Sequence, residues 1–325
     1  MYKEWIPRIL VLLTVFLLAG QVFSATTLKL EQGQDWKEVT SQPEDKYSLA
    51  VSELKMLVSQ GKSEQIAPTV AMLKAKYPEI NTPDFDLFVE AEWFYAEDKI
   101  THAVRAYDTL LSRYPQSPLY FVALDRQYSI AKEYLGGRKK PILKVFRIAG
   151  YSEGVKIMDR VIDRAGNSPL GLKASRTIAE SYESRGKYEE AYERWSEVSS
   201  KWPLGEPGKE ALLSMARCKH AAYRGPDYDV SALVSAKSYY ENFRQRYPEE
   251  AKQYEIDKRL EQIRQQIAYK EYKIGEFYQR TGNKQSSDIY ANMIVGQWPD
   301  TIAARGARDI LDKNQQPETK KAKKK

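Results

Sequence analysis

The chain has 325 residues, a formal net charge of +7 and a single cysteine, Cys218. One cysteine excludes an internal disulfide, so the fold must be stabilised by its core. The two histidines, His102 and His220, lie far apart in the sequence, and no acidic pair or glycine-rich loop has a catalytic spacing. Composition therefore favours a non-enzymatic protein without a cofactor or a metal site.

The positive charge is concentrated at the two ends of the chain. Residues 1–24 carry a net charge of +1 and residues 313–325 a net charge of +5, which leaves +1 for residues 25–312. A net charge this close to zero over residues 25–312 argues against a nucleic-acid-binding surface. We interpret residues 313–325 as a disordered, lysine-rich tail.

The N-terminus has the pattern of a secretory signal peptide over residues 1–24. Lys3 and Arg8 give a basic start, residues 9–19 are apolar, and small residues precede Ala25. An uncleaved anchor is the alternative, but the apolar run is short for the roughly 20 residues that cross a bilayer. We expect an exported, periplasmic protein, and no cysteine lies near the signal to form a covalent lipid anchor.

Residues 25–45 are polar, and we expect a flexible lead-in there. Beyond it, a turn residue is followed sixteen positions later by an aromatic residue and then proline. Four copies have this spacing: Gly61 with Tyr77-Pro78, Asp98 with Tyr114-Pro115, Gly186 with Trp202-Pro203 and Gly282 with Trp298-Pro299. A fifth copy, Gly225 with Tyr247-Pro248, has six more residues. A constant distance from a turn to a helix stop predicts a repeated helix of constant length.

Small and large apolar residues recur inside these copies. They are Ala91, Phe94, Ala103, Tyr107 and Leu110 in one copy and Ala179, Tyr182, Ala191, Trp195 and Val198 in another. Small residues let two helices approach, and aromatic residues fill the space beside them. The pattern is that of tetratricopeptide repeats. We predict an all-α, right-handed tetratricopeptide-repeat solenoid of about six helix pairs over residues 46–312, with Cys218 at a small, packed position.

Two segments interrupt the pattern. Residues 251–280 contain neither proline nor glycine before Gly275, and their apolar spacing predicts one long helix. The third pair contains a basic and apolar insertion at residues 138–150. The candidate binding residues for a partner or a membrane surface are all in that insertion: Arg138, Lys139, Lys140, Ile142, Leu143 and Phe146. The alternative is a loop that folds back over the core.

The C-terminal part resembles a known family. The run 240–248 (YENFRQRYP), residues 258–260 (KRL), residues 269–272 (YKEY) and residues 298–301 (WPDT) together resemble BamD. The BamD family comprises periplasmic lipoproteins of the outer-membrane β-barrel assembly machine. The resemblance extends loosely over residues 45–312. It implies a scaffold that binds the periplasmic domains of the barrel-inserting subunit.

We therefore expect a scaffold for envelope proteins in outer-membrane β-barrel assembly, with peripheral contact to a membrane. An adaptor for peptidoglycan synthesis or cell division is the alternative, in which the tail at residues 313–325 contacts the cell wall. A groove of aromatic and aliphatic side chains with a basic rim would bind an extended or helical segment in either case.

Overall fold

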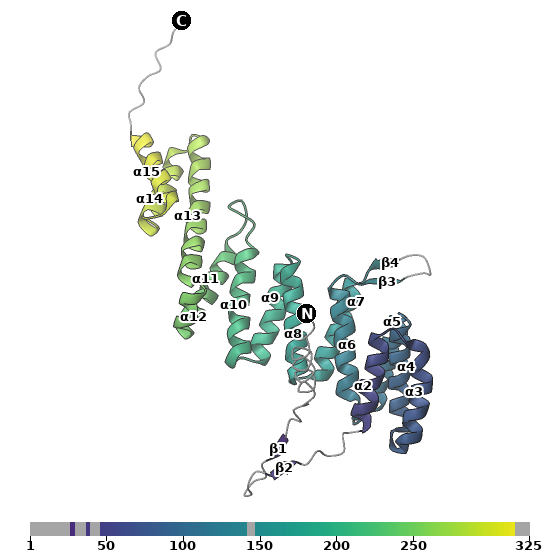
Figure 1. Cartoon of the computed structure of the whole chain (residues 1–325). Coiled ribbons are helices and arrows are strands. Elements are labelled where there is room, and N and C mark those ends of the chain that lie inside the picture. Colours follow the sequence, from purple (N-terminus) through teal and green to yellow (C-terminus); the bar gives the residue numbers. More distant parts are fainter. Residues whose placement is uncertain (1–26, 30–36, 40–45, 142–146, 316–325) are drawn as a thin grey trace, which may run out of the picture. The chain divides into compact units, whose positions relative to one another are not determined.

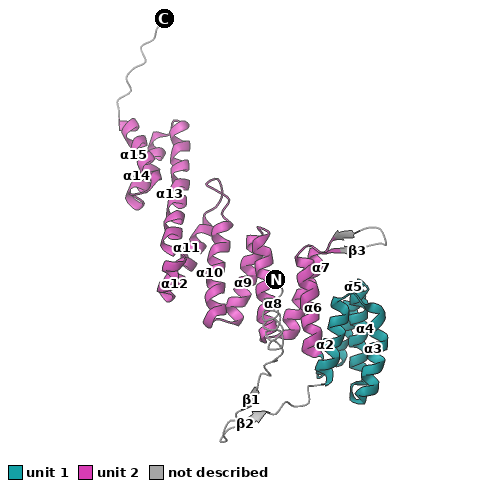
Figure 2. Cartoon of the chain, viewed as in Figure 1, with its two compact units in different colours: residues 1–119 teal, residues 120–325 magenta. Residues whose placement is uncertain are grey.

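The computed structural model describes residues 27–29, 37–39, 46–141 and 147–315 (Figure 1). The predicted signal peptide, most of the predicted lead-in and residues 316–325 of the predicted tail lie outside these ranges. The chain divides into two compact units, residues 1–119 and residues 120–325 (Figure 2). Almost all of the described residues are helical, as the sequence predicts.

Unit 1 contains two helix pairs and a short hairpin. Its elements are β1 (Thr27–Lys29), β2 (Lys37–Val39), α2 (Lys46–Ser59), α3 (Ser63–Lys76), the 3-10 helix η1 (Pro78–Ile80), α4 (Pro83–Ala96) and α5 (Ile100–Arg113). Strands β1 and β2 pair antiparallel within the predicted lead-in, which the sequence does not predict. Helix α4 packs between α5 and α2, and Phe85, Phe88 and Tyr107 are fully buried.

Unit 2 continues the helix pairs and contains the insertion. Its elements are α6 (Tyr120–Leu135), β3 (Lys139–Pro141), β4 (Arg147–Ala149), α7 (Tyr151–Ala165), α8 (Pro169–Ser184), α9 (Tyr188–Lys201), α10 (Gly205–Ala221), α11 (Ser231–Arg246), α12 (Pro248–Gln253), α13 (Ile256–Arg280), α14 (Lys284–Gln297) and α15 (Ile302–Gln315). Pairs α6/α7, α8/α9, α10/α11 and α13/α14 pack in chain order, and α15 covers α13 and α14.

The backbone explains the spacing found in the sequence. Gly61, Asp98, Gly186, Gly225 and Gly282 all have positive φ angles, between 57° and 121°. This region favours glycine, and aspartate is among the few other residues that tolerate it. The second helices α3, α5, α9 and α14 each have 14 residues and begin two positions after the turn residue. The predicted constant helix is confirmed.

The aromatic residue before each proline ends its helix. Tyr77, Tyr114, Trp202, Tyr247 and Trp298 have φ angles from −128° to −135° with positive ψ, outside the helical region. A following proline disfavours the helical conformation at the residue before it. Together with the turns, these stops define five of the six predicted pairs within the described residues, and α6 and α7 form the other.

Small residues lie where helices cross, as predicted. Cys218 is fully buried with Ala179, Ala191 and Trp195, and burial raises the pKa of its thiol to about 12. The thiol is therefore protonated at neutral pH. In the last pair, a Cβ on Gly275 would lie 3.2 Å from Cβ of Tyr290, and Ser287 donates a buried hydrogen bond to the Gly275 carbonyl oxygen.

Two boundaries differ from the prediction. The long helix begins at Ile256 rather than residue 251, because Glu255 takes a left-handed conformation with φ of 53° and separates α12 from α13. Helix α15 continues to Gln315, beyond the predicted boundary at residue 312. Asn314 accepts a hydrogen bond from Gln279 of α13 and donates one to Asp288 of α14, which keeps this end in place.

None of the described helices is long and apolar enough to cross a membrane.

Candidate functional site

The first helices of three consecutive pairs line a hollow in unit 2. Helices α8, α10 and α13 line an open hollow of about 760 Å³, and Tyr223 and Tyr240 are also part of its lining. A second hollow of about 380 Å³ shares Arg217 and Arg259 with it. A third, of about 270 Å³, shares Glu180 with the first and Arg176 with the second. We call this connected surface the α8–α10–α13 groove.

A charged pair joins α8 to α10 in the wall of the groove. Nε of Arg217 donates to one carboxylate oxygen of Glu183 at 3.0 Å, and its NH2 donates to the other at 3.2 Å. The indole N–H of Trp195 donates to the same carboxylate at 3.2 Å. Such a two-pronged contact fixes the planes of both groups. Glu183 is therefore already engaged by this chain's own donors.

A neutral contact joins α10 to α13. Nε2 of His220 lies 3.0 Å from Oε1 of Gln266, and the imidazole ring meets the Tyr240 ring edge to face. Burial lowers the pKa of His220, which the contact with Gln266 opposes and the charge of Arg259 reinforces. The imidazole is thus uncharged at neutral pH.

Two tyrosine hydroxyls in the groove are unsatisfied. The side-chain oxygens of Tyr223 and Tyr240 are buried, and neither has a hydrogen-bond partner among the described residues. Burial raises the pKa of Tyr240, while the neighbouring guanidinium groups of Arg259 and Arg217 oppose this change. Arg259 itself forms no ion pair with a described carboxylate. Buried polar groups without partners are rare in proteins, so each one needs an explanation, and a bound polar group is one such explanation.

The structure separates the insertion residues predicted from the sequence into two groups. Arg138 forms an ion pair with Glu133 of α6, Lys139 is exposed, and β3, which contains Lys139 and Lys140, pairs antiparallel with β4. Ile142, Leu143 and Phe146 lie outside the described residues. Arg138 and Lys139 do not line the groove, and the role of all six residues in binding stays a prediction.

The base of this hairpin packs closely on α6. A Cβ on Gly150 would lie 2.3 Å from the Tyr134 ring and 2.5 Å from the Arg138 carbonyl oxygen. A Cβ on Gly154 would lie 2.8 Å from Cβ of Tyr134. Two glycines thus give the chain room to turn back against Tyr134.

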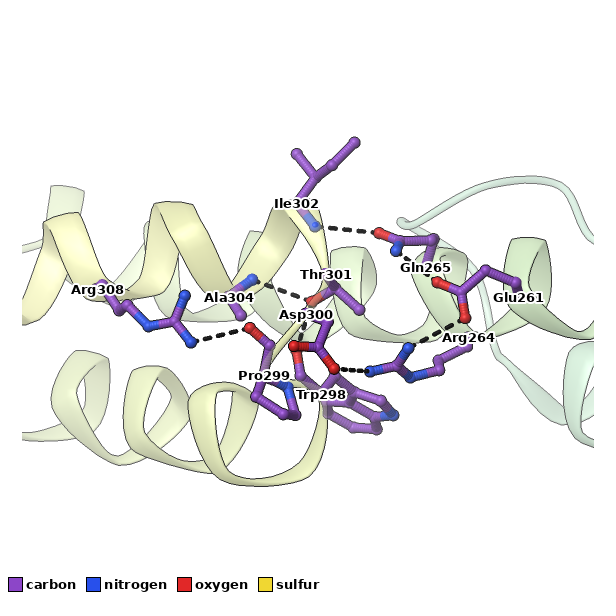
Figure 3. Close-up of polar contacts among 10 residues, drawn as sticks. All are labelled: Glu261, Arg264, Gln265, Trp298, Pro299, Asp300, Thr301, Ile302, Ala304 and Arg308. Carbon is purple, nitrogen blue, oxygen red and sulfur yellow. Dashed lines mark hydrogen bonds and ion pairs between the residues drawn. The ribbon is translucent and has the colours of Figure 1, made fainter.

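The WPDT motif connects the last helix to the long one (Figure 3). Oγ1 of Thr301 accepts a hydrogen bond from the backbone N–H of Ala304 at 3.1 Å and donates one to the Trp298 carbonyl oxygen at 2.8 Å. It is therefore the N-cap of α15. The backbone N–H of Ile302 donates to Oε1 of Gln265 on α13 at 3.1 Å.

Two further contacts hold the same turn (Figure 3). NH2 of Arg308 donates to the Pro299 carbonyl oxygen at 2.8 Å, and Arg264 of α13 lies 3.7 Å from the Asp300 carboxylate. The motif thus forms the start of α15, and Asp300 connects it to α13.

Replacing Thr301 with alanine is expected to lower the free energy of unfolding by about 1–2 kcal/mol, because the side chain is fully buried and caps α15. Urea unfolding followed by circular dichroism measures the change. Thr281→Ala is the control, since that exposed hydroxyl contacts only carbonyls of its own helix and should matter by a few tenths of a kcal/mol. Equal losses in the two variants would contradict the capping role.

Lys270 of the YKEY motif forms hydrogen bonds to a loop. Nζ of Lys270 on α13 donates to the carbonyl oxygens of Pro226 at 3.1 Å and Tyr228 at 2.7 Å. These residues belong to the six-residue expansion between α10 and α11. The long helix therefore holds the extra loop beside the groove.

Sequence comparison identifies a family over the same part of the chain. The model of YfiO, described as an outer membrane lipoprotein, matches residues 219–325. This C-terminal third is similar to the YfiO family. YfiO is the BamD family, so the match confirms the resemblance that the motifs indicate. The YfiO-like third contains α11 to α15, including Tyr240, Arg259 and the WPDT turn.

Two solved structures are similar to the chain at low identity. One is the C-terminal part of a tetratricopeptide-repeat protein from Cytophaga hutchinsonii, with 14% identity and a TM-score of 0.38, covering 82% of this chain and 88% of that one. The other is PilW, a type IV pilus biogenesis factor, with 14% identity and a TM-score of 0.29, covering 81% and 98%. No curated protein matches the chain significantly.

Proposed function

We propose that this chain is a non-enzymatic scaffold that binds envelope proteins during the assembly of outer-membrane β-barrel proteins. The observation that carries the proposal is the α8–α10–α13 groove, a connected hollow with unsatisfied hydrogen-bonding groups on a helical-repeat framework. Repeat proteins commonly use such faces to bind extended or helical segments of partners. Similarity of the α11–α15 region to outer membrane lipoproteins supports a partner in the envelope.

The side chains of the groove support binding rather than catalysis. The Glu183 carboxylate accepts hydrogen bonds from Arg217 and Trp195, and Nε2 of His220 is hydrogen-bonded to Gln266. These contacts orient both groups within the wall, as expected for a binding surface. Within the described ranges, no three His, Cys, Asp or Glu side chains are grouped so that they could hold a metal.

Export and membrane contact belong to the same proposal. A signal peptide at residues 1–24 would deliver the chain to the periplasm. The insertion at residues 138–150 would provide a second, basic contact to a partner or to a membrane surface. The domain boundaries would then be a lead-in at residues 25–45, a repeat body ending at Gln315 and a lysine-rich tail after it.

Blocking the groove is expected to abolish partner capture. Ala221 is exposed and lines the cavity, so Ala221→Trp fills the hollow without removing a core contact. Tagged full-length chain and this variant are each used to capture proteins from native envelope extracts, followed by mass spectrometry. Ser200→Trp on α9, exposed and outside the groove, is the matched control and should capture the same proteins as the parent.

The identity of the captured proteins separates the two functions. Recovery of the barrel-inserting subunit with periplasmic domains, lost in Ala221→Trp alone, is the expected result. Recovery of peptidoglycan synthases or division proteins would assign the chain to the alternative adaptor role. Equal capture by the parent and by Ala221→Trp would contradict binding through the groove.

A further inference from the structure

The internal repeats suggest what the groove lacks. Counted from the turn residue of each pair, and allowing for the six-residue expansion, Tyr107, Trp195 and Tyr240 occupy one equivalent position. All three side chains are buried in the core. The Tyr107 hydroxyl donates to Glu92 at 2.9 Å, and the Trp195 indole donates to Glu183 at 3.2 Å. In two pairs, therefore, the donor of this aromatic residue is satisfied by a carboxylate.

The third aromatic donor has no such partner. The Tyr240 side chain is fully buried, the residue is part of the groove lining, and no described residue accepts a hydrogen bond from its hydroxyl. The Tyr223 hydroxyl in the same wall is also without a partner. A buried donor without an acceptor costs free energy that a bound acceptor recovers.

A positive charge lies beside the unsatisfied hydroxyl. Arg259 of α13 lines both the first and the second hollow and is close enough to influence Tyr240 and His220. The other guanidinium groups of the groove have carboxylate partners, Glu183 for Arg217 and Glu210 for Arg176. In the described part of the chain, no ion pair engages Arg259.

We propose that the groove binds a carboxylate of its partner polypeptide, which receives a charge-assisted contact from Arg259 and hydrogen bonds from the Tyr240 and Tyr223 hydroxyls. This carboxylate would serve as the acceptor that Glu92 and Glu183 provide in two other pairs, from positions six and three residues before their respective turn residues. The inference rests on the proposed function, because it names the chemistry that the groove recognises.

Among the groups that line the cavity, Arg259 is the one that can make the charge-assisted contact to the carboxylate. His220 is uncharged, Glu183 is bound by Arg217, and the remaining acidic side chain in the wall, Glu180, interacts with Arg176. The carboxylate has two sources, an aspartate or glutamate side chain of the partner or its C-terminal residue. Both present the same planar, negatively charged group to an arginine.

Three pools of dodecapeptides test the proposal and separate these sources. All are N-terminally acetylated, and their other positions are randomised over residues other than aspartate and glutamate. One pool has a central glutamate and an amidated C-terminus, one a central glutamine and an amidated C-terminus, and one a central glutamine and a free C-terminus. Retention on the immobilised full-length chain is measured by mass spectrometry. We expect one carboxylate pool to be retained about tenfold more than the neutral pool.

Substitutions on one helix provide the matched comparison. Arg259→Gln is expected to remove the preference for carboxylate. Lys258→Gln, which removes the same charge from the adjacent exposed position, is expected to keep it. Tyr240→Phe should weaken retention of the carboxylate pool several-fold without lowering thermal stability, because no described residue accepts a hydrogen bond from the deleted hydroxyl.

The outcomes distinguish this inference from the proposed function. Equal retention of the three pools, or a preference that survives Arg259→Gln, would overturn carboxylate recognition. If Ala221→Trp still abolishes retention of the peptides in that case, the proposed binding in the groove stands, but carboxylate recognition does not. Retention that is unchanged in Ala221→Trp, or no retention of any pool, would contradict both.

Discussion

Replacing Trp195 with alanine is expected to lower the free energy of unfolding by about 4 kcal/mol, the largest loss for one side chain in unit 2. Trp195 is 1% exposed and packs among Ala179, Ala191, Val198 and Cys218, between α8, α9 and α10. Alanine would leave a cavity that these small residues cannot fill. The substitution also removes the indole donor from Glu183 in the groove wall.

Urea unfolding of the full-length protein, followed by circular dichroism, measures this loss. Hydrogen exchange should locate it in α8 to α10, because neighbouring pairs in a repeat protein can unfold separately. Trp93→Ala is the matched control, since that side chain is 37% exposed in unit 1 and should cost far less. A loss in Trp195→Ala no larger than in Trp93→Ala would refute the packing argument.

Gly208→Ala is expected to cost about 3 kcal/mol, although it adds only one methyl group. A Cβ at Gly208 would lie 2.4 Å from the carbonyl oxygen of Pro203 and 2.8 Å from that of Trp202. Both contacts are with backbone, so no side chain can rotate to relieve them. The start of α10 would have to move away from the end of α9.

Gly296→Ala is the control for this substitution. Gly296 lies on the exposed surface of α14, and a Cβ there would meet nothing within 4 Å. Alanine at such a position should raise the free energy of unfolding by about 0.5–1 kcal/mol. Thermal and urea unfolding of both variants therefore should shift in opposite directions. A loss below 1 kcal/mol for Gly208→Ala would show that the connection between α9 and α10 can adapt.

The features predicted correctly from the sequence are those set by local backbone chemistry. Gly186 supplies a positive φ angle, and Trp202-Pro203 ends the helix, so the bounds of α9 follow from residues close to them. The break before α13 could not be found in this way. It lies at Glu255, which is neither glycine nor proline, and its left-handed conformation has no signal in the apolar pattern.

The groove could not be predicted from the sequence, for a different reason. It brings together Glu183, Arg217, Tyr240 and Arg259 from four helices, and no local pattern marks a side chain whose partner is missing. The sequence instead draws attention to the basic residues of the insertion, which form a continuous run. One signal was present: aligning Tyr240 with Tyr107 and Trp195 and searching each pair for an acidic partner would have pointed to the fifth pair.

Both long expansions of unit 2 replace the turn inside a helix pair: the β3–β4 hairpin between α6 and α7, and the loop between α10 and α11. Lengthening a closed loop costs little entropy, and the helices on either side remain in register. For protein engineering, the short turn at Gly186 is thus a suitable place to insert an epitope or a fluorescent reporter. The same insertion at Trp202-Pro203 would separate α10 from α9 and destroy the surface that it was meant to monitor.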